Sequence, residues 1–405
     1  MTGSSAPAVT EAVGRLGTEG AFAVLARARE LERQGRDVIH LEIGEPDFEC
    51  PPHVAEAGIE AIRAGQTHYC QSAGLPELRE SAAAYLSRTR DVAIAPASVL
   101  VANGAKPLLF FTVLATCGPG DEVVYPDPGF PIYESAIRFA GATPVPLPLH
   151  EERGFAIDPA ELTALLSGRT RLVILNSPQN PTGAVVSGED LAAAAEKILR
   201  TPAWVLTDEV YARITYDADA PSIASLPGML ERTILLDGFS KTYAMTGWRM
   251  GYAVVPDWLV KAYSQLIINT ISGVTAFAQA GAIEALRGPQ AEVDGMVEEF
   301  LARRDLIVDG LNSIPGFRCH RPTGAFYVFP EISGTGLTGA QLADRLLNEA
   351  GVCVLAGTAF GGVGVNHIRI SYANSRENLT EALTRIRAFV EPLVSARSAA
   401  PAASA

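Results

Sequence analysis

Several features that would mark a specialised class of protein are missing from this 405-residue chain. The five cysteines are scattered and form no CxxC pair, and the six histidines lack ligand spacing, so neither a disulfide framework nor a zinc site is expected. There is no apolar run of the roughly 18 residues that a membrane-spanning helix needs, and no secretory signal opens the chain. The net charge of −13 disfavours non-specific nucleic-acid binding. We therefore expect a cytoplasmic protein with no metal, membrane or nucleic-acid partner.

Lysine is scarce, since only four of the 32 basic residues are lysines. Lys106 and Lys241 lie in glycine-containing turns next to strand-like runs. Lys197 and Lys261 lie on helical patterns, where a solvated face is the better interpretation. The first two lysines are therefore candidates for a functional role.

Apolar runs of four to six residues alternate with helical patterns from about residue 98 onward. Continuous apolar runs of this kind are typical of buried, mostly parallel strands. After residue 270 the sequence pattern changes, and strand-like and helical segments are mixed. The pattern predicts an α/β fold, with a large domain whose mostly parallel sheet is sandwiched by helices and a smaller α+β domain.

The length of the chain also favours two domains, because a single core stops growing at about 250–300 residues. We expect an N-terminal arm and helix that join the small domain (1–45), a large ligand-binding domain (46–290), a small C-terminal domain (291–394) and a flexible tail (395–405).

Polar residues gather where four of the predicted strands end, in "VANGAKP", "LNSPQNPTG", "LTDEVY" and "LDGFSK". In open α/β sheets, ligands bind at the carboxyl ends of strands. The open backbone at Gly104 and Ala105 suits a phosphate at a helix N-terminus. An ordinary strand–helix turn that binds no ligand would have the same sequence pattern. Asp208 and Glu209 follow an apolar strand, where a carboxylate could be a helix cap or a solvated turn residue. If a cationic ring nitrogen lies opposite, a buried carboxylate there would instead keep that nitrogen charged.

The stretch "DGFSKTYAMTGWRMGY" (237–252) holds Lys241 and Arg249 eight residues apart. A straight helix would separate them by about 12 Å. Gly247 makes a bent loop more plausible, which could turn both cations toward one ligand. Arginine is a permanent partner for phosphate, while lysine can lose its proton and act as a nucleophile.

Four motifs occur in order along the chain: "NSPQNPTG", "TDEVY", "GFSKTYAMTGWRMGY" and "HIRISYA". Together they closely resemble the motifs of fold-type I aminotransferases of class I/II, the aspartate aminotransferase-like branch, over residues from about 15 to 392. The resemblance implies pyridoxal 5′-phosphate as cofactor. It also implies transfer of an amino group between an L-amino acid and a 2-oxo acid, with 2-oxoglutarate and glutamate as one pair, and a homodimer with active sites at the subunit interface.

The resemblance implies a role for each matching residue. Lys241 is similar to the lysine that forms a Schiff base with the cofactor and moves the proton. Asp208 resembles the partner of the ring nitrogen, Phe130 the aromatic on the ring face, and Asn180 and Tyr211 the partners of the phenolic oxygen. The phosphate would be held by Gly104, Ala105, Lys106, Ser240 and Arg249, and by Tyr69 of the neighbouring subunit. The substrate carboxylate would be held by Arg369, Asn180 and Gly44.

Two positions depart from the family pattern: Gly238 stands where a serine is common, and Ala105 where a second glycine is common. The stretch "GTGLTG" (334–339) fits a dinucleotide motif, but no acid ends the next strand, so a simple loop is expected.

Two other functions are compatible with part of these motifs. A lyase or synthase on the same fold, such as a C–S β-lyase, would use nearly the same residues. A cofactor-binding regulator would need a DNA-binding module, and only about 40 residues precede "GEPDF". We also hypothesise that Glu19 disfavours acidic donor side chains, although a helix-start residue favoured by the macrodipole is the better interpretation of this glutamate.

Overall fold

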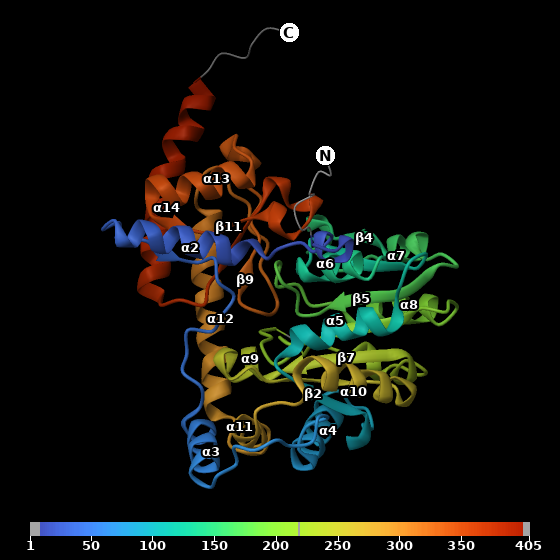
Figure 1. Ribbon diagram of the computed structural model, residues 1–405. Coiled ribbons are helices and arrows are strands. Elements are labelled where there is room, and N and C mark those ends of the chain that lie inside the picture. The colour runs from blue at the N-terminus through green and yellow to red at the C-terminus, as the bar shows by residue number, and fades with distance from the viewer. Residues whose placement is uncertain (1–8, 218, 400–405) are drawn as a thin grey trace, which may run out of the picture.

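The computed structural model describes residues 9–217 and 219–399. Within them, a seven-stranded sheet has the strand order β2-β8-β7-β6-β5-β3-β4 (Figure 1). Its strands are β2 (Val99–Ala102), β3 (Glu122–Asp127), β4 (Thr143–Pro148), β5 (Thr170–Asn176), β6 (Trp204–Asp208), β7 (Thr233–Gly238) and β8 (Gly251–Val254). Strand β8 is antiparallel to β2 and β7, and the other neighbouring pairs are parallel. The predicted α/β fold with a mostly parallel sheet is confirmed.

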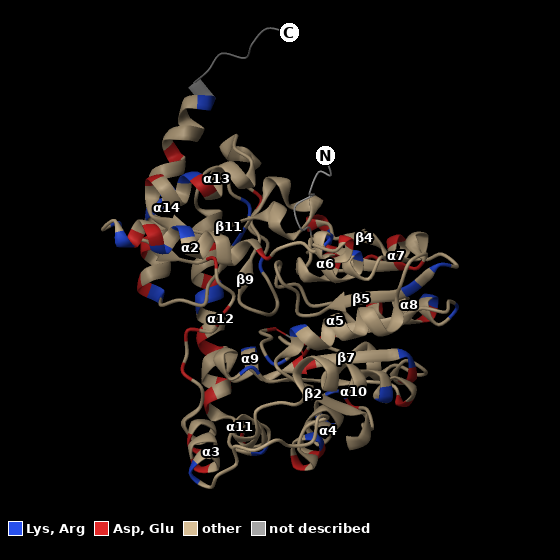
Figure 2. Cartoon of the chain, in the orientation of Figure 1, with Lys and Arg blue, Asp and Glu red and all other residues tan. Residues whose placement is uncertain are grey.

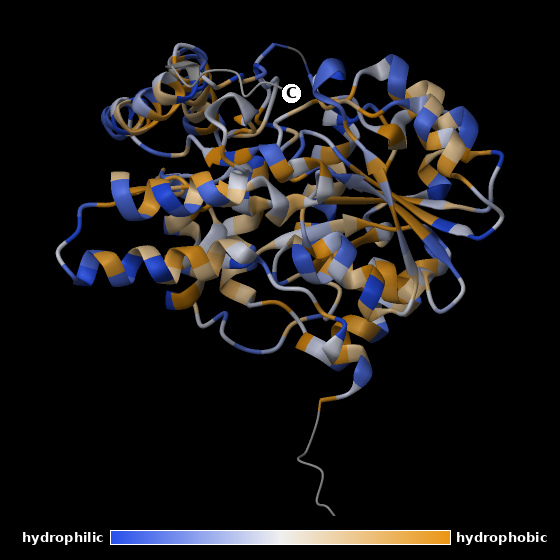
Figure 3. Ribbon diagram, turned by 90° about the horizontal axis from the view of Figure 1, so that it is seen from above, coloured by the Kyte–Doolittle hydropathy of each residue, from blue (hydrophilic) through white to orange (hydrophobic). Residues whose placement is uncertain are grey.

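Helices cover both faces of this sheet. Their bounds are α3 (Pro52–Arg63), α4 (Pro76–Thr89), α5 (Ala105–Thr116), α6 (Ile132–Phe139), α7 (Pro159–Leu165), α8 (Gly188–Ile198), α9 (Phe239–Thr242), α10 (Asp257–Ile271) and α11 (Ala276–Arg287). In β5, Leu172 and Ile174 pack with α5, α6 and α10, whereas Val173 and Leu175 pack with α7 and α8. Because side chains alternate along a strand, burial on both faces requires the continuous apolar run seen in the sequence. Figure 3 shows this hydrophobic colouring along the central strands.

The second region contains the smaller sheets, with β1 (Ile39–His40) parallel to β10 (Val352–Cys353), and with β12 (Ile368–Ser371) between β11 (Leu355–Ala356) and β9 (Tyr327–Val328). Its helices are α12 (Ala291–Asn312), α13 (Gly339–Arg345) and α14 (Arg376–Ala399). Near the N-terminus, α1 (Glu11–Gly14) precedes α2 (Gly20–Arg33). The β1–β10 pairing ties the N-terminal segment to the C-terminal part, and Arg27 of α2 donates to Asp344 of α13 at 2.5 Å. The domain boundaries expected from the sequence stay a prediction.

Local structure accounts for three further features. Helix α14 extends to Ala399, into the segment where a flexible tail is expected; residues 400–405 lie outside the described residues. The stretch 334–339 lies in a loop, where Thr338 caps α13 through a capping box with Gln341. The three prolines of β4 are tolerated because this strand lies at the edge of the sheet.

Charged residues of both signs lie on the helices and loops (Figure 2). Among the helices that the structure describes, none is long and apolar enough to span a bilayer.

Candidate active site

A cavity of about 540 Å³ lies at the carboxyl ends of the parallel strands. Its wall combines the turns after β5, β6 and β7 with the start of α5 and with segments from the second region. The predicted site residues found in this wall are Gly44, Ala105, Lys106, Phe130, Asn180, Asp208, Tyr211, Ser240, Lys241, Arg249 and Arg369. The tertiary structure therefore brings residues from distant parts of the chain to one cavity.

Lys241 and Arg249 reach this cavity because the chain bends twice between them. Lys241 lies in the four-residue helix α9, and Arg249 ends a 3-10 turn over Thr246–Trp248. Arg249 has a φ of 55°, a left-handed conformation that leaves the helical path. The bent loop expected from Gly247 is thus present.

The Lys241 amine is held at one side of the cavity. Its Nζ donates a hydrogen bond to the Gly44 carbonyl at 2.5 Å and lies 6.0 Å from the centre of the Tyr211 ring. Burial lowers the pKa of Lys241 to about 8. Near neutral pH this amine can therefore lose its proton far more easily than an ordinary lysine, as a nucleophile or a general base must.

An anion site lies at the N-terminus of α5. Gly104 precedes the helix with a φ of 90°, and a Cβ there would come within 2.7 Å of Arg249 Nη2. Glycine is thus required both by the backbone conformation and by the close approach of the guanidinium. Arg249 is held by the carbonyl of Thr246, which accepts from Nη1 at 2.8 Å. The free amides of the first helical turn and this guanidinium together suit a phosphate group.

The two departures from the family pattern are compatible with this packing. Ala105 is the first residue of α5 and does not have a positive φ, so its methyl group is tolerated. At Gly238, a Cβ would lie 3.3 Å from the Met250 carbonyl oxygen and 3.4 Å from Gly251 Cα. A serine would be tight against β8 at this position, and Ser240 supplies a hydroxyl in the wall instead.

Asp208 places a buried carboxylate at the end of β6. The Tyr133 hydroxyl donates to its Oδ2 at 2.7 Å, and Asn176 Nδ2 donates to its backbone carbonyl at 2.9 Å. Burial raises the pKa of Asp208 to about 6. A cationic nitrogen opposite this carboxylate would favour its ionised form.

Arg369 stands on β12 at the other side of the cavity. Its Nη1 donates to Asn180 Oδ1 at 3.1 Å, and Nη2 donates to the Glu42 carbonyl. The guanidinium lies 4.7 Å from the centre of the Tyr327 ring. Its Nε has no hydrogen-bond partner within the described part of the chain. The group keeps donor capacity for a carboxylate, which a guanidinium can bind with two parallel hydrogen bonds.

The side chain of Lys106 has a different partner from the one the resemblance implies. Its Nζ pairs with Glu19 Oε2 at 2.6 Å and lies 5.4 Å from the centre of the Phe130 ring. Its backbone amide, in the first turn of α5, is the part that remains for an anion. Glu19 lies at the N-cap of α2, makes no capping hydrogen bond with its side chain, and also lines the cavity.

Two predicted site residues are not part of the cavity wall: Gly104, which lies just before α5 against Arg249, and Tyr69. Tyr69 is 98% exposed and lines a separate hollow with residues 273–277. Within one chain it therefore has no site role.

Tyr133, Asn176 and Tyr327 also line the wall, and none of them was assigned a role from the sequence. Tyr133 could have been considered, because it follows Phe130 by only three residues, and the two rings contact edge to face with centres 5.7 Å apart. Asn176 lies within the motif "LNSPQNPTG", and its Oδ1 accepts from the Asn180 amide at 3.0 Å. Tyr327, whose hydroxyl lies 2.7 Å from that of Tyr211, comes from an apolar strand with no polar signal.

A buried ion network lies beneath the wall. Arg90 Nε donates to Glu209 Oε2 at 2.6 Å, and its Nη2 donates to Asp237 Oδ2 at 3.1 Å. Glu209 is therefore a buried partner of Arg90, and the interpretation as a solvated turn residue is wrong. Because Glu209 follows Asp208 and Asp237 is the last residue but one of β7, this network holds the two strand ends that carry the site.

Over most of its length the chain is similar to proteins of one enzyme family. The family model described as "Aminotransferase class I and II" matches residues 36–386. The chain is 41% identical to an aspartate/prephenate aminotransferase of Cereibacter sphaeroides, over 94% of this chain and 98% of that protein. It is 39% identical to an arginine–pyruvate transaminase of Pseudomonas aeruginosa, over 92% of this chain and 95% of that protein. The solved aspartate aminotransferase of Thermus thermophilus with maleate is 37% identical, with a TM-score of 0.91 over 95% of this chain and all of that chain.

Proposed function

This chain belongs to the aminotransferase class I and II family and is an aminotransferase, and we propose that its cavity holds pyridoxal 5′-phosphate between Lys241, Asp208 and Arg249. The observation that carries the proposal is that one cavity wall contains a buried amine, a buried carboxylate and an anion site at a helix start. The lyase or synthase alternative is not favoured, since the relatives above are named aminotransferases or transaminases.

The residues present fit this cofactor. The start of α5, Ser240 and Arg249 would hold the phosphate, and Asp208 would face the ring nitrogen. Phe130 would cover a face of the ring, while Asn180 and Tyr211 would donate to its phenolic oxygen. When bound, the cofactor supplies a cationic ring that withdraws electrons from the Cα of an amino acid.

The side chains of this protein then have separate tasks. Asp208, buried and supported by Tyr133, holds the proton on the ring nitrogen by its negative charge. Lys241 takes the proton from Cα and returns it, a task suited to an amine whose pKa is about 8. Arg369 holds the α-carboxylate of the amino acid and thereby orients the Cα–H bond toward the lysine. We propose 2-oxoglutarate and glutamate as one substrate pair.

The test is Lys241→Ala, with Lys261→Ala as the matched control on the exposed face of α10. We expect Lys241→Ala to lose both the visible absorbance of the loaded protein and all exchange of amino groups between an L-amino acid and a 2-oxo acid. Lys261→Ala should keep both. Exchange activity retained by Lys241→Ala would remove the central assignment, and ammonia plus pyruvate formed without exchange would restore the lyase alternative.

We further propose that the Glu19–Lys106 pair selects the donor. Because Glu19 holds the ammonium of Lys106, the cavity mouth offers no free cation there to an acidic side chain. Neutral and aromatic donors should therefore exceed aspartate in kcat/KM. Glu19→Ser and the isosteric Glu19→Gln should raise the aspartate rate relative to a neutral donor by about tenfold, a difference of about 1.4 kcal/mol. If both variants keep the donor preference of the unchanged protein, Glu19 has no role in selecting the donor and serves only at the start of α2.

We propose a homodimer in which Tyr69 reaches the phosphate of the neighbouring subunit. The observation in support is that a large aromatic side chain is almost fully exposed in the single chain. Size-exclusion chromatography with light scattering should give twice the chain mass. Tyr69→Phe should weaken cofactor retention without changing that mass. A monomer with full activity would contradict the proposal. The cytoplasmic location stays a prediction.

A further inference from the structure

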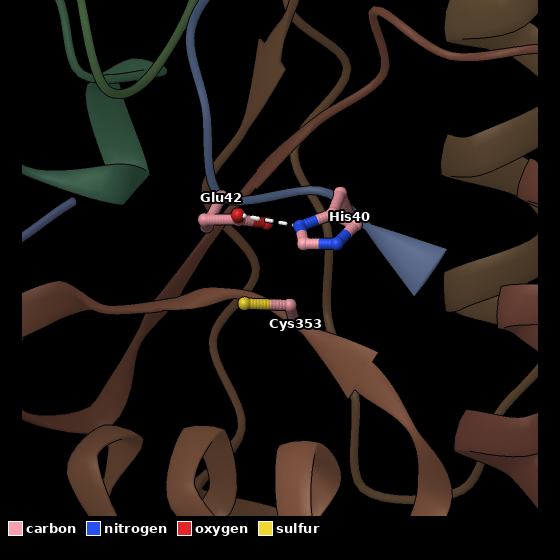
Figure 4. Close-up of side chains that lie close together, drawn as sticks. All are labelled: His40, Glu42 and Cys353. Atoms are coloured by element: carbon pink, nitrogen blue, oxygen red, sulfur yellow. Dashed lines mark hydrogen bonds and ion pairs between the residues drawn. The ribbon is translucent and has the colours of Figure 1, made fainter. Parts of the chain in front are cut away.

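Three side chains with metal-binding atoms lie together where the N-terminal segment meets the C-terminal part of the chain. Figure 4 shows His40, Glu42 and Cys353, which come from β1, the residues after it, and β10. The ligand atoms that they offer all lie within 4.8 Å of one another. His40 and Cys353 are direct neighbours across the parallel pair of strands. Glu42 lies two positions beyond His40, and its Oε1 is 2.8 Å from His40 Nδ1.

Burial leaves one atom of this cluster poorly satisfied. Glu42 and Cys353 are fully buried, while about 29% of the His40 side chain is exposed. Within residues 9–217 and 219–399, Glu42 Oε2 accepts no hydrogen bond of full geometry, and the Cys353 thiol beside the carboxylate is only a weak donor. A buried carboxylate oxygen without a full hydrogen bond costs free energy, so it favours the arrival of a cation. The exposed edge of the His40 ring gives such a cation a way in.

A second carboxylate orients the histidine. Glu32, on α2, lies with its Oε1 3.1 Å from His40 Nε2. A histidine that binds a metal through one ring nitrogen usually donates its other N–H to a carboxylate, which fixes the ring. The pair formed by Glu32 and His40 has this arrangement, with Nδ1 facing the cluster.

We propose that His40, Glu42 and Cys353 form a binding site for a divalent transition-metal ion, with Zn²⁺ as the best match. Imidazole nitrogen, carboxylate oxygen and thiolate sulfur are the ligand atoms that Zn²⁺ takes in proteins, and three protein ligands leave a fourth position for water. Bond lengths of about 2.0–2.3 Å put the ligand atoms of a tetrahedral site roughly 3.3–3.6 Å apart, so side-chain rotations close the cluster. Metal–nitrogen, metal–oxygen and metal–sulfur bonds form, and the protons on Nδ1 and on the thiol leave to solvent.

The location gives the site a structural consequence. A metal bound there would link β1 directly to β10. The Glu42 carbonyl accepts from the Arg369 guanidinium, so the same link would stiffen a support of the proposed substrate-carboxylate arginine. Spacing along the sequence gave no sign of the site, because His40 and Cys353 are neighbours only across the strand pair.

The experiment measures zinc on the full-length, untagged, cofactor-loaded protein. The protein is treated with a chelator, dialysed against Zn²⁺ and then against metal-free buffer, and its zinc content and X-ray absorption spectrum are recorded. We expect one zinc per chain with one sulfur ligand at about 2.3 Å. Cys353→Ser should remove the sulfur ligand, and Glu32→Gln should weaken zinc binding about 10- to 100-fold.

Two variants serve as matched controls. Cys319→Ser removes another buried thiol, and His150→Gln breaks a surface histidine–glutamate pair with Glu161. Both should bind zinc as the unchanged protein does. The proposal is overturned if the unchanged protein retains no stoichiometric zinc, if its spectrum lacks a sulfur ligand, or if the controls lose zinc as Cys353→Ser does. Because the spectrum of the unchanged protein decides on its own, a variant that fails to fold leaves the test intact.

Discussion

Replacing Arg90 by methionine should destabilise the protein more than any exposed substitution, because two buried carboxylates lose their shared cation. Arg90 is 7% exposed, and its guanidinium donates to Glu209 at 2.6 Å, to Asp237 at 3.1 Å and to Thr89 Oγ1 at 2.9 Å. Removing one partner of a buried ion pair costs about 3–5 kcal/mol, since the remaining charge stays desolvated.

The hydrogen-bond donors that remain around the two carboxylates should keep the loss of folding stability within this range. Glu209 keeps hydrogen bonds from the hydroxyls of Ser222 and Thr207, and Asp237 keeps one from the Gly238 amide. Burial already raises the pKa of Asp237 to about 7, and Arg90 is the main group that opposes this rise. With a pKa of about 7, Asp237 is largely protonated at pH 6 even beside Arg90, so losing the cation costs less at that pH. At pH 8 the carboxyl is ionised in the unchanged protein, and in the variant it must either stay charged without its partner or take up a proton.

The pH dependence follows from the same shift. A carboxyl whose pKa is higher in the folded state than in the unfolded state binds more protons when folded, so stability falls as pH rises between the two values. Relative to the unchanged protein, Arg90→Met should lose about 3 kcal/mol at pH 6 and a value nearer 5 kcal/mol at pH 8.

Urea unfolding followed by circular dichroism at both pH values measures this loss. Arg200→Met, which removes an exposed pair with Glu196, is the control and should change stability little. Adding Glu209→Gln and Asp237→Asn to Arg90→Met should restore much of the stability, because the uncompensated charges are then gone. A loss below about 1 kcal/mol at both pH values would refute the role of Arg90 as the buried counter-ion.

Three further predictions concern the cavity. Tyr133→Phe removes the hydroxyl that donates to Asp208, so the pKa of this carboxyl, about 6, should rise. The acidic limb of the plot of kcat/KM against pH should then move up by about one pH unit, and an unchanged limb would contradict this link. Arg369→Lys loses one charge-assisted hydrogen bond to the substrate carboxylate, which is worth about 1.5–3 kcal/mol. The value of kcat/KM should therefore fall roughly 10- to 150-fold, and a loss confined to kcat would point to another role for Arg369. In cofactor-free protein, labelling of Lys241 by an amine-reactive reagent should rise as pH passes about 8, where the buried amine loses its proton. If the labelling of Lys241 has the same pH dependence as that of the exposed Lys261, the lowered pKa of Lys241 is contradicted.

Much of the site could be predicted because its residues lie in local motifs. Asp208 ends the apolar strand β6 and Lys241 follows the apolar strand β7, and parallel strands present their carboxyl ends at one edge of a sheet. Arg249 lies just before β8, whose start is paired with the end of β7 because these two strands are antiparallel. The strand assignments rested on runs such as "LVIL" (172–175), in which every residue is apolar because both faces of the strand are covered. These inferences need no knowledge of how distant segments meet.

Other contacts could not be predicted because they join segments without a shared pattern. Tyr327 lies in an apolar strand, yet its hydroxyl meets that of Tyr211 inside the cavity. The carboxylate of Glu209 reads as a turn residue in "LTDEVY", but it is buried against Arg90 from another helix. Lys106 was grouped with the phosphate residues, and only the structure shows its ammonium bound to Glu19.

The sequence by itself determined the α/β class, the order of strands and helices and the identity of the amine, carboxylate and guanidinium at the strand ends, because strand burial and turn chemistry are local properties. The tertiary structure alone decided which charges are paired. Arg90 with its two carboxylates, Glu19 with Lys106, and His40 and Glu42 beside Cys353 all come from segments far apart in the chain. A pairing of this kind depends on which side chains packing brings within a few ångströms. That distance decides whether a charge is neutralised, a pKa is shifted or a metal can bind.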